Sequence, residues 1–251
     1  MYRFAVTFAA AALFAVSAQA ATITTVNYMG NAAGLAGVRS HIDAYRAAEM
    51  ARGVVEIRTE GFEGFAAWPH GVTANPLTTN VGVIAGLGGK GSGSSAVNGG
   101  DAPMVRTGNV AGRQNITAGG TRFLDSNDTL GFSWTVDFGG LSFDRISFVL
   151  TDVADQGATM TLSGGGFFQD YSFTRQANGA INFVDILLDA PLTSLTLTFL
   201  NNRVNDGFGI DELSVSLTGD APAPVPVPAA GLLLASGLGL LALNRRRARR
   251  A

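Results

Sequence analysis

The sequence predicts an all-β fold, a jelly-roll-like antiparallel β-sandwich with one N-terminal helix and a C-terminal transmembrane helix. Its 251 residues include 33 glycines and only 14% charged residues, a composition that argues against a helical bundle or a coiled coil. Apolar residues recur at every second position in several segments after Val54, which is the period of half-buried strands. An uncharged apolar run, residues 229–243, stands apart from that pattern and predicts the membrane helix.

Residues 1–20 have the organisation of a secretory signal peptide. Arg3 precedes an apolar run from Phe4 to Val16, and Ala18 and Ala20 form an A-x-A site. Small residues at these two positions are typical of cleavage by signal peptidase, and the run lacks the polar face of a globular helix. We therefore expect export through the inner membrane and cleavage after Ala20.

The next segment, residues 21–53, is predicted to be helical. Between Asn27 and Gly53, apolar residues recur at spacings of three and four: Leu35, Val38, Ile42 and Tyr45. This period is typical of an amphipathic helix, and Gly53 is a suitable residue to end it.

Residues 54–219 are predicted to form the sandwich. Four segments alternate apolar and small polar residues, and their apolar members are Phe132, Trp134, Val136 and Phe138; Ile146, Phe148 and Leu150; Leu195, Leu197 and Phe199; and Leu213, Val215 and Leu217. Each set lies on one face of a strand and predicts the core, with turn signals such as GG and SGGG between strands. The glycine- and serine-rich stretch 86–120 is expected to be a long surface excursion of this domain.

The C-terminal end predicts a membrane anchor. Residues 220–228 contain APAPVPVP, an alternation that favours an extended spacer because proline lacks a backbone N–H. As a helix, residues 229–243 would span about 22 Å of a ~30 Å hydrocarbon core, and local thinning of the bilayer can close the gap. The basic tail, residues 244–251, is expected to stay in the cytoplasm; its arginines are Arg245, Arg246, Arg247, Arg249 and Arg250.

The three-part layout of this end resembles a bacterial PEP-CTERM sorting signal of the VPLPA type. The motif is Val225-Pro226-Val227-Pro228-Ala229, which departs from the VPLPA form at Val227. The resemblance implies an exosortase, a membrane-embedded cysteine transpeptidase, as a partner. It also implies cleavage at or near the motif and transfer of the protein to the cell surface or extracellular polymer.

Charge and composition exclude several classes of function. All 19 acidic residues lie between Asp43 and Asp220, where only 10 of the 17 basic residues are found. The central part of the chain is therefore acidic and would repel nucleic acid. The lack of cysteine excludes disulfides, thiolate nucleophiles and Cys-ligated zinc.

The motifs of the sequence do not predict an enzyme. Residues 86–91 match G-x-G-x-x-G, but a poor helix former follows them, whereas a dinucleotide site needs a helix N-terminus there. G-x-S-x-G is absent, and both histidines, His41 and His70, are expected at the surface. A carboxylate pair for glycoside hydrolysis is left open, because any two acidic residues could meet in the fold.

Carboxylates at the first and last strands of the sandwich are candidate ligands for calcium. Glu60 and Glu63 lie in TEGFEGF, and Asp206 and Asp211 lie in NDGFGIDEL. Asp211 shares its parity with the apolar residues of the last strand, and an inward carboxylate is costly unless it is paired or bound to a metal. The alternatives are an aspartate in a bulge or hydrogen-bonded to a turn, with both glutamates solvated.

These two terminal segments resemble the jelly-roll, carbohydrate-binding-module-like domains of exported bacterial proteins, in which terminal-strand carboxylates hold a structural calcium ion. A sugar site would need exposed aromatic rings, for which Trp68, Tyr171 and Phe168 are candidates, whereas Trp134 has core parity. We expect a non-enzymatic structural or adhesive component of the envelope or extracellular polymer. A calcium-stabilised module that binds exopolysaccharide is the alternative, and a secreted hydrolase is the weakest one.

Overall fold

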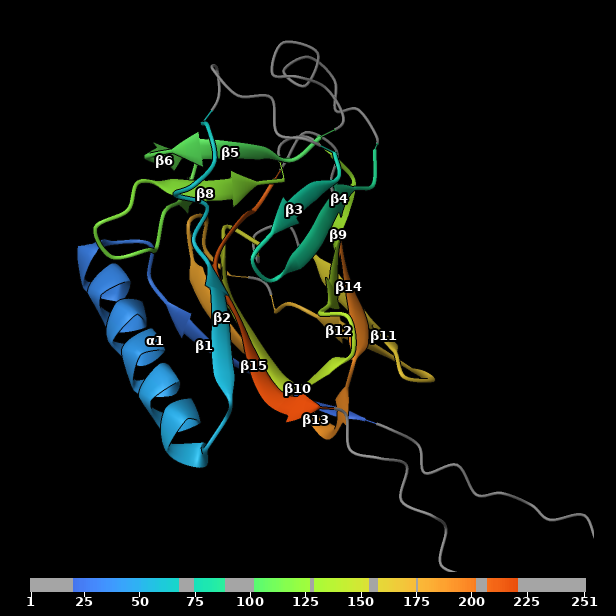
Figure 1. The fold of residues 1–251 in the computed structure, drawn as a ribbon. Helices are drawn as coiled ribbons and strands as arrows, with labels where there is room; N and C mark the ends of the chain where they lie inside the picture. Colours follow the sequence, from blue (N-terminus) through green and yellow to red (C-terminus); the bar gives the residue numbers. More distant parts are fainter. Residues whose placement is uncertain are drawn as a thin grey trace, which may run out of the picture. The chain divides into compact units, whose positions relative to one another are not determined.

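The computed structural model describes residues 20–67, 75–88, 102–126, 129–153, 158–174, 176–201 and 207–220. They form two antiparallel sheets, a short hairpin and one helix (Figure 1), which confirms the predicted jelly-roll-like sandwich. The signal segment up to residue 19, the sorting motif, the predicted membrane helix and the basic tail lie outside the described residues. Within the described part of the chain, no helix is both long and apolar enough to cross a membrane.

One sheet, called sheet A, has seven strands in the order β1-β13-β10-β15-β8-β5, with β2 also paired to β15. The strands are β1 (Ala21–Tyr28), β2 (Glu56–Glu60), β5 (Met104–Thr107), β8 (Arg122–Asp125), β10 (Leu141–Thr151), β13 (Ile181–Leu192) and β15 (Gly209–Asp220). β8 pairs with the start of β15 at Gly209 and Ile210, and β2 pairs with residues 213–217. β8 and β2 therefore pair with successive parts of the same strand, β15.

The other sheet, called sheet B, has six strands in the order β12-β11-β14-β9-β4-β3. They are β3 (Leu77–Thr79), β4 (Gly82–Gly86), β9 (Gly131–Asp137), β11 (Thr159–Gly164), β12 (Phe167–Ser172) and β14 (Ser194–Leu200). A separate hairpin consists of β6 (Asn109–Val110) and β7 (Arg113–Gln114). It lies within the stretch 86–120 that the composition predicts to be a surface excursion. That prediction is wrong for β5, which belongs to the same stretch but is a strand of sheet A with Met104 and Val105 buried.

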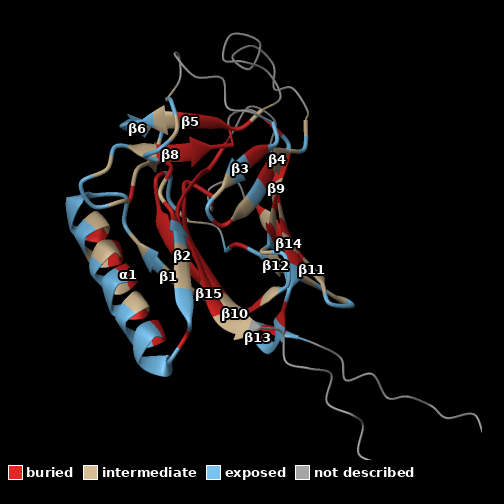
Figure 2. Ribbon diagram, in the orientation of Figure 1, coloured by how far each residue is buried: buried red, intermediate tan, exposed pale blue. Residues whose placement is uncertain are grey.

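The core lies between the two sheets, as the alternation of apolar residues predicts (Figure 2). Trp134 of β9 is fully buried, its ring packs edge to face on Phe148 of β10 at 5.9 Å between centroids, and its Nε1 donates to the Val81 carbonyl at 3.0 Å. The apolar residues predicted for the other strands are buried in the same cluster. Phe138 is the exception, because it is only partly buried at the edge of the sandwich.

The predicted helix exists as α1 (Ala32–Arg52), but its predicted beginning is wrong. Asn31 is the N-cap, and its side chain accepts a hydrogen bond from the Gly34 N–H at 2.9 Å. Residues 21–28 instead form β1, which pairs along its whole length with β13. The β-branched run from Thr22 to Val26 favours a strand. The predicted end is right, since Gly53 is the C-cap with φ of 89°.

Helix α1 covers the outer face of sheet A (Figure 1). Val38, Ile42 and Tyr45 are buried against this face as their spacing predicts, and Phe183 of β13 lies in the same cluster. Leu35 is only partly buried at its border. Sheet A is therefore covered on both faces by apolar side chains, which explains why α1 and β1 belong to the sandwich and do not form a separate segment.

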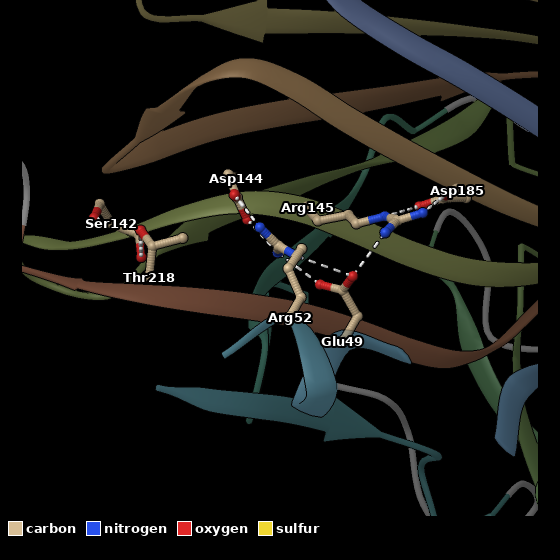
Figure 3. A network of polar contacts seen from close by, with 7 residues as sticks. All are labelled: Glu49, Arg52, Ser142, Asp144, Arg145, Asp185 and Thr218. Atoms are coloured by element: carbon tan, nitrogen blue, oxygen red, sulfur yellow. Dashed lines mark hydrogen bonds and ion pairs between the residues drawn. The ribbon is translucent and has the colours of Figure 1, made fainter. Parts of the chain in front are cut away.

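A buried network of ion pairs also joins α1 to sheet A (Figure 3). Glu49 of α1 is fully buried and contacts Arg145 of β10 at 2.6 Å and Arg52 at 2.7 Å. Arg145 is paired in turn with Asp185 at 2.5 Å, and Arg52 with Asp144 at 2.6 Å. Each arginine thus contacts two carboxylates.

Candidate functional site

Two strands that carry carboxylates predicted to bind calcium are neighbours, but the direction of Asp211 differs from the prediction. β2 and β15 are neighbours, and Glu60 lies opposite Leu213. Strict alternation does not hold at Asp211, because β15 has a bulge at Glu212, which has a φ of 53°. Asp211 therefore lies opposite Val149, on the helix-facing side of sheet A, and not beside the core-facing Leu213.

Asp211 is nevertheless buried, with only 1% of its surface exposed, and protein groups surround its carboxylate. The backbone N–H groups of Ile116 and Thr117 donate to Oδ2 at 2.7 and 3.0 Å, and the N–H of Glu212 donates to Oδ1 at 2.8 Å. Burial raises the pKa of Asp211 to about 8, whereas the donors at Ile116 and Thr117 act to lower it. This is the alternative of an aspartate in a bulge and hydrogen-bonded to a turn.

The two glutamates are also occupied by protein donors. Glu60 accepts hydrogen bonds from the N–H groups of Phe62 at 2.8 Å and Asn80 at 3.2 Å. Glu63, which is exposed, accepts from the N–H groups of Thr121 and Arg122, both at 2.7 Å. Each carboxylate therefore holds a turn by accepting two backbone hydrogen bonds.

Among the described residues, no group of three or more acidic or histidine side chains could hold a metal ion. Asp206 lies outside the described residues, so its part in a calcium site stays a prediction. We expect excess EGTA to leave the thermal unfolding temperature of the full-length protein unchanged, because the three described carboxylates already have donors. A lower unfolding temperature in EGTA, restored by added calcium, would show that a structural ion is bound.

The aromatic residues predicted for sugar stacking have different surroundings. Tyr171 is partly buried, its hydroxyl shares a hydrogen bond with Thr25 Oγ1 at 3.1 Å, and its ring packs on Phe173 at 5.1 Å. Trp68 lies outside the described residues. Phe168 on β12 is 69% exposed, so it is the one of the three whose described surroundings leave its ring open to a ligand.

His41, which the sequence predicts at the surface, is partly exposed. Its Nδ1 shares a 2.8 Å hydrogen bond with the Tyr28 hydroxyl, and its ring lies 4.5 Å from that of Phe183. These contacts place it at the border of the helix–sheet cluster, where it helps to hold α1 on β1. His70 lies outside the described residues.

The candidate functional site is a polar groove of about 620 Å³ between β2 and the hairpin of β3 and β4. The pairing register of β2 with β15 explains which residues of β2 face the groove. Glu56 and Arg58 lie opposite Leu217 and Val215 of β15, and directly opposite residues share a face of the sheet. Because those residues face the core, the charged side chains of β2 are directed to the gap between the sheets, at its open edge.

The opposite wall of the groove depends on a glycine. Gly82 has a φ of 125°, and a Cβ atom there would lie 2.2 Å from the Thr135 carbonyl oxygen. Only glycine therefore lets the β3–β4 hairpin pack this closely against β9. This packing places Thr78 and Asn80 in the wall, with Asp137 at the end of β9.

The groove offers many hydrogen-bonding groups around one aromatic ring. The Arg58 guanidinium lies 4.5 Å from the centroid of the Phe138 ring and 3.2 Å from the Glu56 carboxylate. Asp137 is exposed and accepts one hydrogen bond from the Gly139 N–H at 2.8 Å. Carboxylate, guanidinium, amide and hydroxyl groups of this kind can bond to the adjacent hydroxyls of a polyhydroxyl ligand.

The described residues that line the groove include two carboxylates, Glu56 and Asp137, and no histidine, cysteine or serine. No pattern in the sequence predicts this site. Its residues come from three separate segments around positions 56, 80 and 137, and no local spacing joins them.

Comparison with known proteins identifies no family for the chain. No family model matches the sequence, and no curated protein matches it significantly. Among solved structures, the CBM22-1 xylan-binding domain of Paenibacillus barcinonensis Xyn10C is 17% identical. The alignment covers 66% of this chain and 97% of that one, with a TM-score of 0.36.

The K2 cleaved adhesin domain of Lys-gingipain is 10% identical over 64% of this chain and 97% of that one, with a TM-score of 0.39. A xylan-binding domain from CBM 22 is 15% identical over 47% of this chain and 85% of that one, with a TM-score of 0.27. Similarities this low assign neither a ligand nor an activity to the chain.

Proposed function

We propose that the protein is an exported, non-catalytic adhesive component of the bacterial surface or extracellular matrix, and that it binds polysaccharide in the groove between β2 and the β3–β4 hairpin. The observation that carries the binding is the groove itself. Glu56, Arg58, Asn80 and Asp137 present planar polar groups to one space, and Phe138 adds an aromatic ring. Neutral chains suit it best, because two carboxylates would repel an acidic polymer.

Trp68 lies outside the described residues and stays a candidate from the sequence alone. We propose that its indole supplies a stacking surface for a sugar ring.

The binding proposal predicts a large effect of two conservative substitutions. Glu56→Gln and Asp137→Asn together keep the size of the side chains but remove both charges, and hydrogen bonds to charged groups contribute about 1.5–3 kcal/mol each. We expect at least about a tenfold weaker affinity for xylohexaose or cellohexaose by isothermal titration calorimetry. Asp43→Asn, at an exposed position of α1, is the matched control and should bind as the wild type does. Equal affinity of all three proteins would contradict the proposal.

The export proposal is supported by the two ends of the sequence. The A-x-A site at Ala18 and Ala20 is typical of a signal peptide. The Pro226 and Pro228 motif, the apolar run 229–243 and the arginines after it resemble a three-part sorting signal. The partners would be signal peptidase, the inner membrane and an exosortase-type transpeptidase.

Substitution of the motif tests this route. With Pro226→Ala and Pro228→Ala together, we expect the protein to stay in the inner-membrane fraction of its native host, whereas the wild type reaches the surface or medium. Pro222→Ala with Pro224→Ala, in the spacer before the motif, is the control and should be released normally. Full-length protein in the cytosol with both ends intact would contradict export.

A further inference from the structure

Strand β1 forms one end of sheet A and pairs with β13 on one side only. The Asp189 N–H donates to the Ala20 carbonyl at 3.0 Å, so the backbone groups of Ala20 are directed to β13. Those of Ala21 are directed the opposite way, because its N–H and its carbonyl both bond to the side-chain amide of Gln169 at 3.0 Å. These bonds fix the direction of every backbone group along the strand.

Three residues of β1 have backbone groups on the free edge. In an antiparallel pair, residues that exchange hydrogen bonds with the neighbouring strand alternate with residues that do not. Ile23, Thr25 and Asn27 therefore have the same direction as Ala21, away from β13. Among the described residues, no strand and no side chain bonds to the N–H or carbonyl groups of these three. Such a row of unpaired groups is a template for another strand.

The other edges of the two sheets have the protection that β1 lacks. Strand β5 has four residues and includes Arg106, β12 has six and includes Asp170, and β3 has only three. Strand β2, at the side of β15, has three charged residues among five. Short length and charged side chains are common ways to prevent pairing at an edge. By contrast, the eight residues of β1 include no charged residue and no proline, and their pairing with β13 has no bulge.

We propose that β1 pairs with β1 of a second copy of this chain, antiparallel and across a two-fold axis, so that sheet A continues through a dimer. Because Ala21 is already bonded to Gln169, the free run extends from Ile23 to Asn27 and its centre is Thr25. In this register Thr25 lies opposite Thr25 of the second copy, and Ile23 lies opposite its Asn27. Each of these pairs exchanges two backbone hydrogen bonds. A two-fold interface needs a self-complementary surface, which an antiparallel edge strand provides.

The side chains at the free edge are compatible with this pairing. On the side of the sheet that carries α1, Thr24 would lie opposite Val26 of the second copy, and pairs of β-branched residues stabilise neighbouring strands. A groove of about 470 Å³ lies beside these two residues, and small residues of α1 line it, namely Gly37, Ser40 and Ala44. The groove leaves room for the side chains of an added strand. No like charges meet, since β1 has no charged residue.

The dimer leaves the proposed polysaccharide groove free. That groove is lined by β2, which pairs with β15, whereas β1 forms the opposite end of the strand order of sheet A. The pairing of β1 does not depend on the proposed function. Where both hold, the dimer presents two grooves, and two linked sites retain a polymer longer than one site does.

Cross-linking of full-length protein tests the pairing. The chain contains no cysteine, so a disulfide between single-cysteine variants joins two copies. In the proposed register Thr24 and Val26 of the second copy form a pair without hydrogen bonds, whose Cα atoms lie about 4.5 Å apart, within the range of a disulfide. We expect a mixture of Thr24→Cys and Val26→Cys to form disulfide-linked dimers on mild oxidation. Thr107→Cys, exposed on the edge strand β5, is the matched control and should remain monomeric.

Two further variants test whether association depends on β1. Thr24→Lys places two like charges beside the two-fold axis, and like charges across an interface cost several kcal/mol. Asn27→Pro removes a donor from the free edge without loss of a bond to β13. We expect each to weaken self-association at least about tenfold in sedimentation experiments, in the same detergent and with an unchanged thermal unfolding temperature. Thr107→Lys should associate as the wild type does.

The outcomes separate this inference from the proposed function. Monomeric wild-type protein, equal cross-linking at Thr24 and Thr107, or unchanged association of both β1 variants would each overturn the dimer. Binding of a different protein at β1 by a monomeric chain would overturn it as well. Thr24→Lys should bind xylohexaose as tightly as the wild type does, so a loss of the groove and a loss of the dimer are observed independently.

Discussion

Replacement of Glu49 by alanine should lower the free energy of unfolding by about 3 kcal/mol, near the lower end of the values for broken buried ion pairs. The carboxylate is fully buried and contacts two arginines. Its loss removes a partner from Arg145 and Arg52, whose side chains are 24% and 36% exposed. The effect should not be larger, because Asp185 and Asp144 remain beside the two arginines.

Urea denaturation of Glu49→Ala and Glu56→Ala compares their losses in the free energy of unfolding. Glu56 is exposed and paired with Arg58 at 3.2 Å, and exposed pairs contribute about 0–1 kcal/mol. Equal losses in the two variants would show that the network does not stabilise the packing of α1 on sheet A.

The contribution of Glu49 should also depend on pH. Burial acts to raise its pKa, but the hydrogen bond from Arg52 and the charges of Arg145 and Arg52 outweigh it and lower the pKa below the ordinary value of 4.5. The folded state therefore binds the proton less tightly than the unfolded chain does. Its stabilisation is present at neutral pH and is lost as the pH falls through the folded-state pKa. The difference in stability between wild type and Glu49→Ala should narrow over that range.

Replacement of Trp134 by alanine should have the largest effect of all, a loss of about 3–5 kcal/mol in the free energy of unfolding. Trp134 is among the largest fully buried side chains and lies between the sheets against Phe148. The change leaves a cavity, and it also removes the donor of the Val81 carbonyl.

Phe168→Ala is the matched control, because it removes an aromatic ring from the same sheet at a site that is 69% exposed. Surface substitutions of this kind usually change stability by less than about 0.5 kcal/mol. The loss in the free energy of unfolding for Trp134→Phe should lie between those for Trp134→Ala and Phe168→Ala, because this variant retains an aromatic ring but not the hydrogen bond. A loss for Trp134→Ala no larger than that for Phe168→Ala would contradict the assignment of the core.

The position of Trp134 follows from the sequence, whereas that of Glu49 does not. Trp134 alternates with Ser133 and Thr135, and a strand with this pattern has one apolar face wherever it lies in a sheet. Glu49 lies between Ala48 and Met50 in the helix, and its pair with Arg52 has the helical spacing of three residues. Nothing near it in the sequence indicates the second arginine. This arginine, Arg145, is 96 residues away in the chain.

The distinction between local patterns and contacts of distant residues also explains why β1 and Asp211 differ from the predictions. The strand β1 was not predicted, because its partner β13 lies more than 150 residues later and a short run has little periodicity of its own. The parity of Asp211 was misjudged because a bulge inserts one residue into the register, and a bulge is set by pairing with β10. The burial of Asp211 was still predicted correctly.

By itself, the sequence determined the properties that depend on near neighbours in the chain: the class of fold, the face of most core residues, and the helical spacing and its end at Gly53. Only the tertiary structure decided which carboxylates hold turns, which rings remain exposed, and that Glu56, Asn80 and Asp137 line one groove. Local order depends on a few successive side chains, whereas a binding groove depends on pairings between distant strands. Burial of the whole core selects those pairings. The spacing of the paired residues in the sequence therefore does not reveal them.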